Sequence, residues 1–387
     1  MAKTVLFKIE PAILRYARKY SGFSVEEVAK KTKIKIDKLK EYEDKETEIP
    51  VSHLNKLSTV YKRALVFFLL KSVPADAVEP KDFRIVYASG EELFSPDALL
   101  AIRRARYIQS SIAELAENNF NYDFPIASIN TDTDELAAWL RNYLGVKISD
   151  QHKWSSPAIA LKEWKLVIES KEIFILQQNL SKDDISAFCF VDKNPYLIML
   201  NSAEHENRRI FSLFHEMGHI FLRKSGICTP EDLSRNSYQY IKIEKFCNQF
   251  SASFLLPKNE FICDPSVINL VKIPFNRWLD EDLNKISIKY RVSKEVILRR
   301  CLTLGFINEN DYKNKRNEWI KKSEEFKKIK KKGKIIIPQH IKCISQNGRG
   351  VTSFILNQYH INKISYSAVS EILGIKYKHI SKLEANI

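Results

Sequence analysis

The sequence lacks the long apolar runs and the glycine-rich loops that mark membrane proteins and nucleotide-driven enzymes. Its longest uncharged apolar run, residues 64–70, is far shorter than the roughly 18 residues that span a bilayer. Lys8 and Glu10 interrupt the segment that a secretory signal would keep apolar. With only 10 glycines, the chain has neither a G-x-x-x-x-G-K-S/T nor a G-x-G-x-x-G motif. We therefore expect a cytoplasmic protein without a membrane partner.

Cysteine is also scarce and widely spaced. The chain has 6 cysteines, no C-x-x-C pair and no dense disulfide framework of the kind that small secreted domains need. We expect reduced thiols in a reducing compartment. The cysteines are Cys189, Cys228, Cys247, Cys263, Cys301 and Cys343.

Length and charge narrow the class of protein further. A chain of 387 residues exceeds the size at which single cores stop growing, so two or three units are expected. With 44% hydrophobic and 28% charged residues, it is neither disordered nor a coiled-coil rod. Subtracting 47 acidic from 62 basic residues gives a net charge of +15, which favours a polyanionic partner such as nucleic acid.

Four short helices are predicted in the first 70 residues. A capping box formed by Ser24 and Glu27 begins the second helix, and a tight turn at residues 32–34 separates it from the third. The third helix is expected to bury Ile36 and Leu39. This spacing is typical of a helix-turn-helix. The first, third and fourth predicted helices span residues 11–20, 36–43 and 51–61.

The pattern then changes from helices to short strands and back. Strands are predicted at residues 172–176, 185–191 and 196–200, and a helical layer beside them at residues 208–221 and 243–255. Further helices are predicted at residues 95–118, 133–144 and 293–304, and from Ser367 to a C-cap at Gly374. Residues 313–334 hold 11 Lys or Arg against 3 acids, which indicates a solvated helix or a flexible linker.

These patterns together predict a mostly helical α+β protein. A helix-turn-helix bundle begins it, a central domain with a small sheet follows, and a helical region ends it. The predicted limits are 1–72 for the helix-turn-helix domain, 73–150 for linking helices, 151–262 for the core of the central domain, 263–310 for its helical extension, 311–345 for a basic linker and 346–387 for a small C-terminal helical domain.

The motif with the clearest chemistry is an H-E-x-x-H pentapeptide, which begins at His215 and ends at His219. On a helix the two imidazoles lie one turn apart on one face, so both can reach one Zn²⁺ at about 2.0–2.1 Å. Glu216 would then lie beside the metal and could accept a proton from water as that water attacks a carbonyl. Isolated histidines on an apolar helix face are more often core residues, but two with a glutamate between them favour metal-dependent hydrolysis.

A catalytic zinc needs a third protein ligand. The third histidine of the metzincin pattern is absent, so a carboxylate is expected. Glu244 begins a helical run, and Asn248 follows one turn later, where its oxygen could accept the second ring N–H of a ligating histidine. The alternative for Glu244 is a carboxylate that stabilises the helix N-terminus. Glu231 and Asp232 are weaker candidates in a loop.

Two further roles are assigned on weaker signals. Tyr238 and Tyr240 precede the Glu244 helix and are candidate oxyanion stabilisers, although either could simply pack at the helix entrance. The strand at residues 185–191 could offer an edge to which an extended peptide adds, or it could be an ordinary core strand.

Several segments together resemble the ImmA/IrrE family of metallopeptidases. They are LRYARKYSGFSVEEVAKKTKIKIDKLKEYE, KDFR, FSLFHEMGH, EKFCNQFSASFLLP and YRVSKEVILRRCLTLGFI. The resemblance implies His215 and His219 as zinc ligands, Glu216 as general base and Glu244 as third ligand, the same four residues that spacing suggests. It also implies a zincin-like metallopeptidase core at residues 151–262, and a zinc-dependent protease that cleaves a helix-turn-helix repressor and relieves repression.

The predicted function is therefore a zinc endopeptidase, with Mn²⁺ as an alternative metal and a helix-turn-helix repressor as substrate. The alternative is a DNA-binding transcriptional regulator or antitoxin-like repressor whose peptidase fold acts as a sensor. Lys35, Lys38 and Lys40 on the third helix are the candidate DNA contacts, by phosphate attraction more than by base readout. The N-terminal domain could equally dock a protein.

Overall fold

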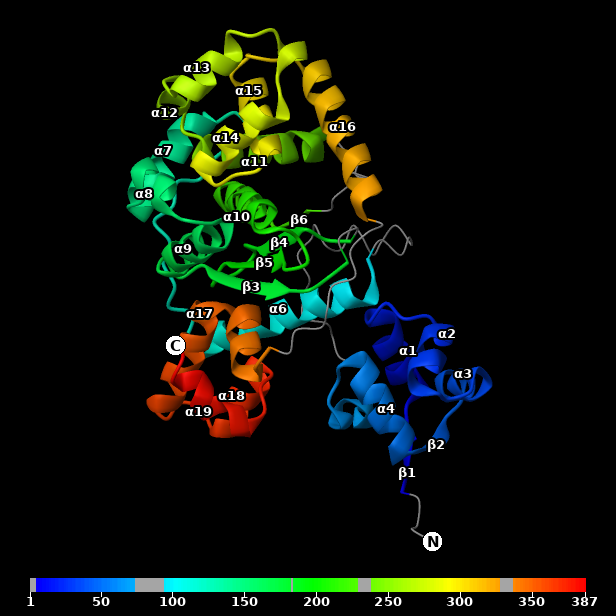
Figure 1. Ribbon diagram of the computed structural model, residues 1–387. Helices are drawn as coiled ribbons and strands as arrows, with labels where there is room; N and C mark the ends of the chain where they lie inside the picture. The colour runs from blue at the N-terminus through cyan, green and yellow to red at the C-terminus, as the bar shows by residue number, and fades with distance from the viewer. Residues whose placement is uncertain (1–4, 74–93, 182–183, 229–237, 328–336) are drawn as a thin grey trace. The chain divides into compact units, whose positions relative to one another are not determined.

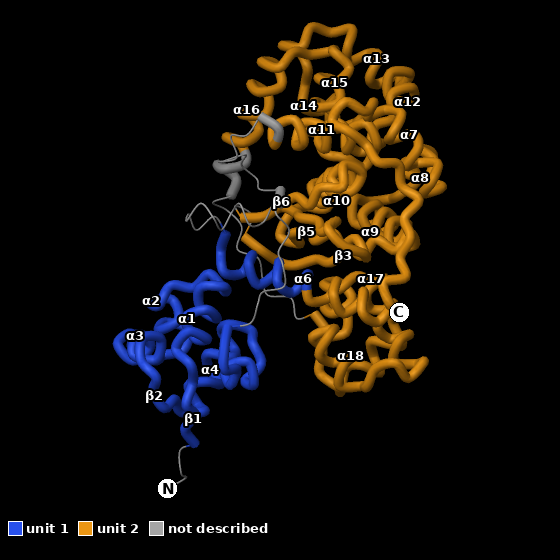
Figure 2. The backbone as a smooth tube through the Cα atoms, turned by 180° about the vertical axis from the view of Figure 1, so that it is seen from behind, with its two compact units in different colours: residues 1–106 blue, residues 107–387 orange. Residues whose placement is uncertain are grey.

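The computed structural model describes residues 5–73, 94–181, 184–228, 238–327 and 337–387. The chain divides into two compact units, residues 1–106 and 107–387 (Figure 2). Helices dominate both, and each has one small sheet, so the predicted mostly helical α+β class is confirmed. Within these ranges, every helix is too short or too polar to span a bilayer.

The first unit is a small helical domain with one two-stranded sheet (Figure 1). The Ser24 side chain accepts the backbone N–H of Glu27 at 3.1 Å, and the Glu27 carboxylate accepts that of Ser24 at 2.9 Å, which confirms the capping box. Lys33 ends that helix in the left-handed region, at φ 59°. The elements are β1 (Leu6–Ile9), α1 (Pro11–Tyr20), α2 (Val25–Thr32), α3 (Ile36–Asp44), β2 (Thr47–Pro50), α4 (Val51–Tyr61), the 3₁₀ helix η1 (Leu65–Leu69) and the start of α6 (Pro96–Leu115).

Apolar packing and a largely buried ion pair between α1 and α3 help to hold this unit together. Leu39 is buried with α1, α2 and α4 side chains, whereas Ile36 is 38% exposed, so its predicted burial is wrong. Ile36 is the first residue of α3 and lies beyond the face that meets the core. Arg18 on α1 donates two hydrogen bonds, of 2.7 and 2.9 Å, to the carboxylate of Glu43 on α3.

The second unit contains the predicted metal-site segments. Gly145 ends α7 with φ 68°, as the sequence predicts, but α18 is capped by Ser365 rather than by Ser367. The helices are α7 (Thr133–Leu144), α8 (Ile148–Lys153), α9 (Pro157–Glu169), α10 (Glu206–Phe221), α11 (Tyr238–Leu255), α12 (Lys258–Ile262), α13 (Pro265–Val271), η2 (Phe275–Arg277), α14 (Asp280–Tyr290), α15 (Lys294–Thr303), α16 (Glu309–Lys327), α17 (Gln339–His360), α18 (Tyr366–Leu373), η3 (Tyr377–His379) and α19 (Ile380–Glu384). α16 makes the first part of the lysine-rich tract helical; the domain limits given above remain predictions.

This unit contains a four-stranded mixed sheet of order β3-β5-β4-β6. Its strands are β3 (Phe174–Gln178), β4 (Ala187–Phe190), β5 (Leu197–Asn201) and β6 (Gly226–Cys228). β3 pairs with β5 in parallel, and β4 is antiparallel to both β5 and β6. The proposed peptide-binding edge at residues 185–191 is therefore wrong, because β4 has a partner on each side and β6 is the terminal strand among the described residues.

Helices α10 and α11 bring the chemistry to one side of the sheet. α10 packs against β4 and β5, and α11 packs along α10 (Figure 1). α9 packs against both α10 and β3, and α17 also packs against β3. One continuous apolar core joins α9, α10 and α11 to strands β3, β4 and β5, with Phe214 of α10 stacked on Phe254 of α11 at 4.0 Å between ring centroids. The apolar residues at helical spacing thus produce two long helices, α10 and α11, whose facing sides are buried.

Candidate metal centre

The H-E-x-x-H motif lies in the C-terminal half of α10. His205 caps the helix by accepting the backbone N–H of Asn207, and an apolar run from Ile210 onward buries the segment against the sheet and α11. His215 and His219 follow one turn apart, so their rings share a face, with 5.1 Å between centroids. Their exposures are 4% and 2%. Both imidazoles are thus held inside the protein.

Glu244 on α11 lies opposite the two imidazoles. Its Oε2 is 3.2 Å from Nε2 of His215, and its Oε1 is 3.3 Å from Nε2 of His219. Two ligand atoms that each lie about 2.0–2.1 Å from a tetrahedral metal are about 3.3 Å apart. The observed separations therefore equal those of ligands around one ion. The two imidazoles outweigh burial and hold the pKa of the Glu244 carboxyl well below its usual range.

Asn248 orients one of the imidazoles. Nδ1 of His215 lies 3.2 Å from Oδ1 of Asn248. Because the amide oxygen only accepts, this hydrogen bond keeps the proton on Nδ1 and leaves the Nε2 lone pair for a metal.

Glu216 lies within the same buried space. Its side chain is fully buried, and neither carboxylate oxygen has a hydrogen-bond partner within the described part of the chain. The Cys189 thiol of β4 is its neighbour, and burial together with the Glu216 charge raises the pKa of that thiol well above its ordinary range. Cys189 thus stays protonated, and Glu216 keeps two acceptor atoms unused.

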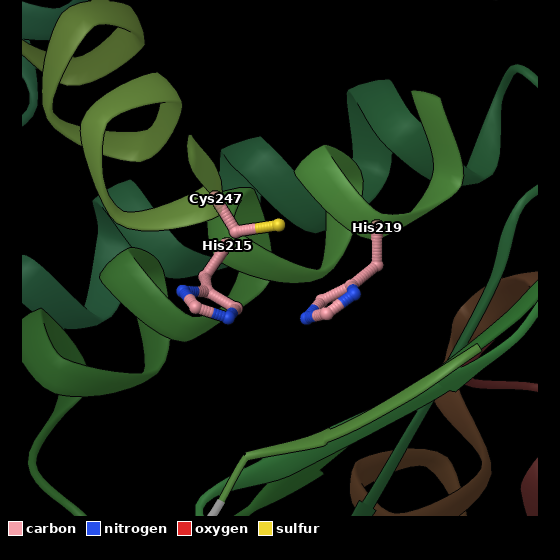
Figure 3. Close-up of side chains that lie close together, drawn as sticks. All are labelled: His215, His219 and Cys247. Carbon is pink, nitrogen blue, oxygen red and sulfur yellow. The ribbon is translucent and has the colours of Figure 1, made fainter. Parts of the chain in front are cut away.

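A thiol that the metal-site prediction did not include completes the cluster. Atoms of His215, His219 and Cys247 that can bind a metal lie within 4.8 Å of one another. Figure 3 shows the Cys247 sulfur over the gap between the two rings. Cys247 is fully buried, and burial raises the pKa of its free thiol. The sequence signal was present, since Cys247 follows Glu244 by three residues and so lies near it on the helix face.

Two glycines make room for this arrangement. A Cβ on Gly226 of β6 would lie 2.6–2.8 Å from three ring atoms of His219, and one on Gly218 would lie 3.0–3.2 Å from atoms of Cys247. Gly226 therefore lets the strand approach the ring, and Gly218 lets α11 approach α10.

The donor set fits a cation. Nε2 of His215, Nε2 of His219 and Oε1 of Glu244 are buried without hydrogen-bond partners in the described residues, although they lie close to one another. Buried polar atoms without partners cost about 1–3 kcal/mol each, and a metal ion would satisfy all three.

The remaining predicted site residues lie elsewhere or outside the described side chains. Tyr240 lies one turn before Glu244 on α11 and is partly exposed. Its role and that of Tyr238, whose side chain is not described, stay predictions, and Glu231 and Asp232 lie outside the described residues. The predicted DNA contacts are all exposed: Lys35 is the N-cap residue of α3, and Lys38 and Lys40 lie on that helix. Lys38 pairs with Glu41 at 2.8 Å.

Paired imidazoles on one helix with a carboxylate on the next are a metallopeptidase arrangement. Residues 168–302 match the model of the peptidase M78 family, described as the IrrE N-terminal-like domain. The match covers about a third of the chain and includes the H-E-x-x-H motif, and the family's description implies a metallopeptidase fold there, in agreement with the resemblance drawn from the sequence.

Other comparisons add little. No curated protein matches the chain. Among solved structures, a Mycobacterium tuberculosis transcriptional regulator is similar at 14% identity and a TM-score of 0.30, over 51% of this chain and 52% of that chain. The likeness thus spans about half of each chain.

Proposed function

We propose that residues 168–302 form a metal-dependent endopeptidase, with His215, His219 and Glu244 as metal ligands. One observation carries the proposal: the Glu244 oxygens lie 3.2 and 3.3 Å from the two imidazole nitrogens, in a buried space where these atoms lack hydrogen bonds. The M78 family match supports it independently. Zn²⁺ is the proposed metal because imidazole and carboxylate ligands in a tetrahedral set suit it, with Mn²⁺ as an alternative.

Each residue has a separate task in this proposal. Zinc bound here would act as a Lewis acid and lower the pKa of a bound water to about 7. Asn248 holds the His215 ring through Nδ1, at 3.2 Å. Glu216, with two unpartnered oxygens, takes the proton from the attacking water and can pass it to the leaving amine.

The first test separates the metal ligands from the base. We expect purified wild type to hold one metal ion per chain, Glu216→Gln to hold it equally well, and His215→Ala to lose it. Glu216→Gln should lower the rate of peptide cleavage by about 10²–10⁴, because a general base contributes that much. Equal cleavage by wild type and Glu216→Gln would refute the role of Glu216.

The proposed substrate is a regulatory protein, in particular a helix-turn-helix repressor. Glu216 is fully buried and Glu244 is 8% exposed. A site this deeply buried does not suit the digestion of many different proteins, which supports a narrow substrate range. We would incubate the metal-loaded full chain with the repressor encoded by the neighbouring gene and identify fragments by mass. An intact repressor, beside cleavage of an unrelated protein, would contradict this substrate.

The alternative function is DNA binding by the N-terminal unit. The observation that favours it is the exposure of Lys35, the N-cap residue of α3, and of Lys40 on that helix, in a chain of net charge +15. DNA affinity should then fall with rising salt, and Lys35→Ala with Lys40→Ala should reduce the slope of log affinity against log salt by about 2. Binding that is independent of salt would argue for protein docking instead.

A further inference from the structure

Cys247 lies close to the three proposed metal ligands but has no role in the proposed function. The residue lies on α11, three residues after Glu244, and α10 supplies the two histidines opposite it. Its sulfur lies within 4.8 Å of a metal-binding nitrogen of each histidine, over the gap between the rings (Figure 3). The two imidazoles therefore lie near both the Cys247 sulfur and the Glu244 carboxylate.

The separations allow a bond from the sulfur to the same ion. With a zinc–sulfur distance of about 2.3 Å and a zinc–nitrogen distance of about 2.0–2.1 Å, tetrahedral ligands lie about 3.5 Å apart. The observed upper limit of 4.8 Å exceeds this by about 1.3 Å at most. A change of the cysteine χ1 angle or a small shift of α11 covers such a distance. Gly218, already in contact with Cys247, keeps the helices close enough.

The other role for Cys247 is that of a small core residue, since buried cysteines often serve only as apolar packing. The environment argues against it. The sulfur lies within 4.8 Å of a metal-binding nitrogen of each imidazole, whereas an apolar filler would face carbon. The buried Cys301 belongs to no such group of donors among the described residues.

We propose that Cys247 is a fourth protein ligand, which binds as a thiolate after losing its proton to solvent as the metal binds, and which closes the coordination position that a catalytic metal keeps for water. This rests on the proposed metal site. Four protein ligands are characteristic of closed zinc sites, and three with an open position of catalytic ones. The fully buried Glu216 and the low exposure of both histidines agree with a closed site. Cys247 bound to the metal thus lowers the activity of the folded enzyme without abolishing it, and hydrolysis proceeds in the molecules in which Cys247, reprotonated, has left the metal and water has taken its place.

Cobalt substitution tests this ligand directly, without an activity assay. The full chain is stripped with a chelator, reloaded with Co²⁺ and measured by absorption spectroscopy. A thiolate ligand gives an intense near-ultraviolet sulfur-to-cobalt charge-transfer band, which nitrogen and oxygen ligands do not give. We expect the band in wild type and in Cys189→Ala, and its loss in Cys247→Ala and Cys247→Ser. Cys189→Ala is the matched control, because that thiol is equally buried and lies beside Glu216.

Zinc titration and activity complete the test. Cys247→Ala should bind zinc at least about tenfold more weakly, because even an outer contact of a metal site contributes that much, and should cleave substrate faster than wild type. Far-ultraviolet circular dichroism checks that the variant is folded. Cobalt bound without a charge-transfer band would overturn the Cys247 proposal alone. A wild type that binds neither cobalt nor zinc would instead overturn the metal site and the proposed function.

Discussion

Substituting Gly226 by alanine should displace a metal ligand without altering any ligand. The new Cβ would lie 2.6 Å from Cε1, 2.7 Å from Nε2 and 2.8 Å from Nδ1 of His219, whereas ordinary contact begins at 3.4 Å. The ring or the strand must therefore move by 0.6–0.8 Å, the difference between these values. Both sides are buried between α10 and β6, so neither can move freely.

This displacement exceeds what a metal site tolerates. Ligand distances in functional sites lie within about 0.2 Å of their ideal values, so His219 would bind poorly or require rearrangement of its neighbours. We expect the zinc affinity of Gly226→Ala to fall by about 10–100-fold, the range for misoriented ligands, which is about 1.4–2.8 kcal/mol. The metal-free protein should lose about 1–3 kcal/mol of stability from overpacking.

A double-mutant cycle isolates the clash. Gly226→Ala, His219→Ala and the double variant are unfolded in urea without metal and followed by tryptophan fluorescence. All 5 tryptophans lie beyond residue 106, so the signal reports on the second unit alone. In the His219→Ala background the new methyl group has space, and its cost should drop to within about 0.5 kcal/mol of zero. An unchanged cost in that background, or wild-type zinc affinity in Gly226→Ala, would refute the reasoning.

Two other predictions concern a metal-site neighbour and a remote carboxyl. Asn248→Ala should weaken zinc binding by about 10–100-fold, measured by competition with a chromophoric chelator, while Asn248→Asp, which keeps the accepting oxygen, should retain it. Burial raises the pKa of Glu169 to about 7 from its ordinary value of 4.5, so the folded chain binds more protons than the unfolded chain between these pH values. The free energy of unfolding should therefore fall as the pH rises from 4.5 to 7, by no more than about 3 kcal/mol. Glu169→Gln should remove that pH-dependent contribution. An identical dependence of unfolding free energy on pH in both proteins would contradict the prediction.

Local signals account for most of what the sequence predicted well. Pro11, the capping box at Ser24, and Gly145 set helix ends through bonds within a few residues, and α1, α4 and α7 have the predicted limits. The helices that carry His215 and Glu244 were also predicted, because their apolar residues recur at helical spacing. Their distance from each other depends on packing, which no local pattern contains.

The sheet order shows where local reasoning ends. β6 has three residues, too few to show an alternation of apolar and polar side chains. Nothing in the sequence therefore indicates that it pairs with the edge of β4 opposite β5. The sequence alone therefore leaves the longer run at residues 185–191 open as an edge strand or an ordinary core strand. The four-residue strands β1 and β2 were missed for the same reason. Short strands are specified by their partners rather than by their own residues.

The metal centre depends on small residues as much as on its donors. A motif search finds His215, Glu216 and His219, but the imidazoles can meet the Glu244 carboxylate only because Gly218 lets α11 approach and Gly226 lets β6 approach. The same close approach of α11 brings the Cys247 sulfur within reach. The close packing of α10 and α11 that brings the three proposed ligands together therefore also places Cys247, the proposed fourth ligand, beside them. Whether the metal keeps a coordination position for water or is closed by Cys247 thus depends on the distance between α10 and α11.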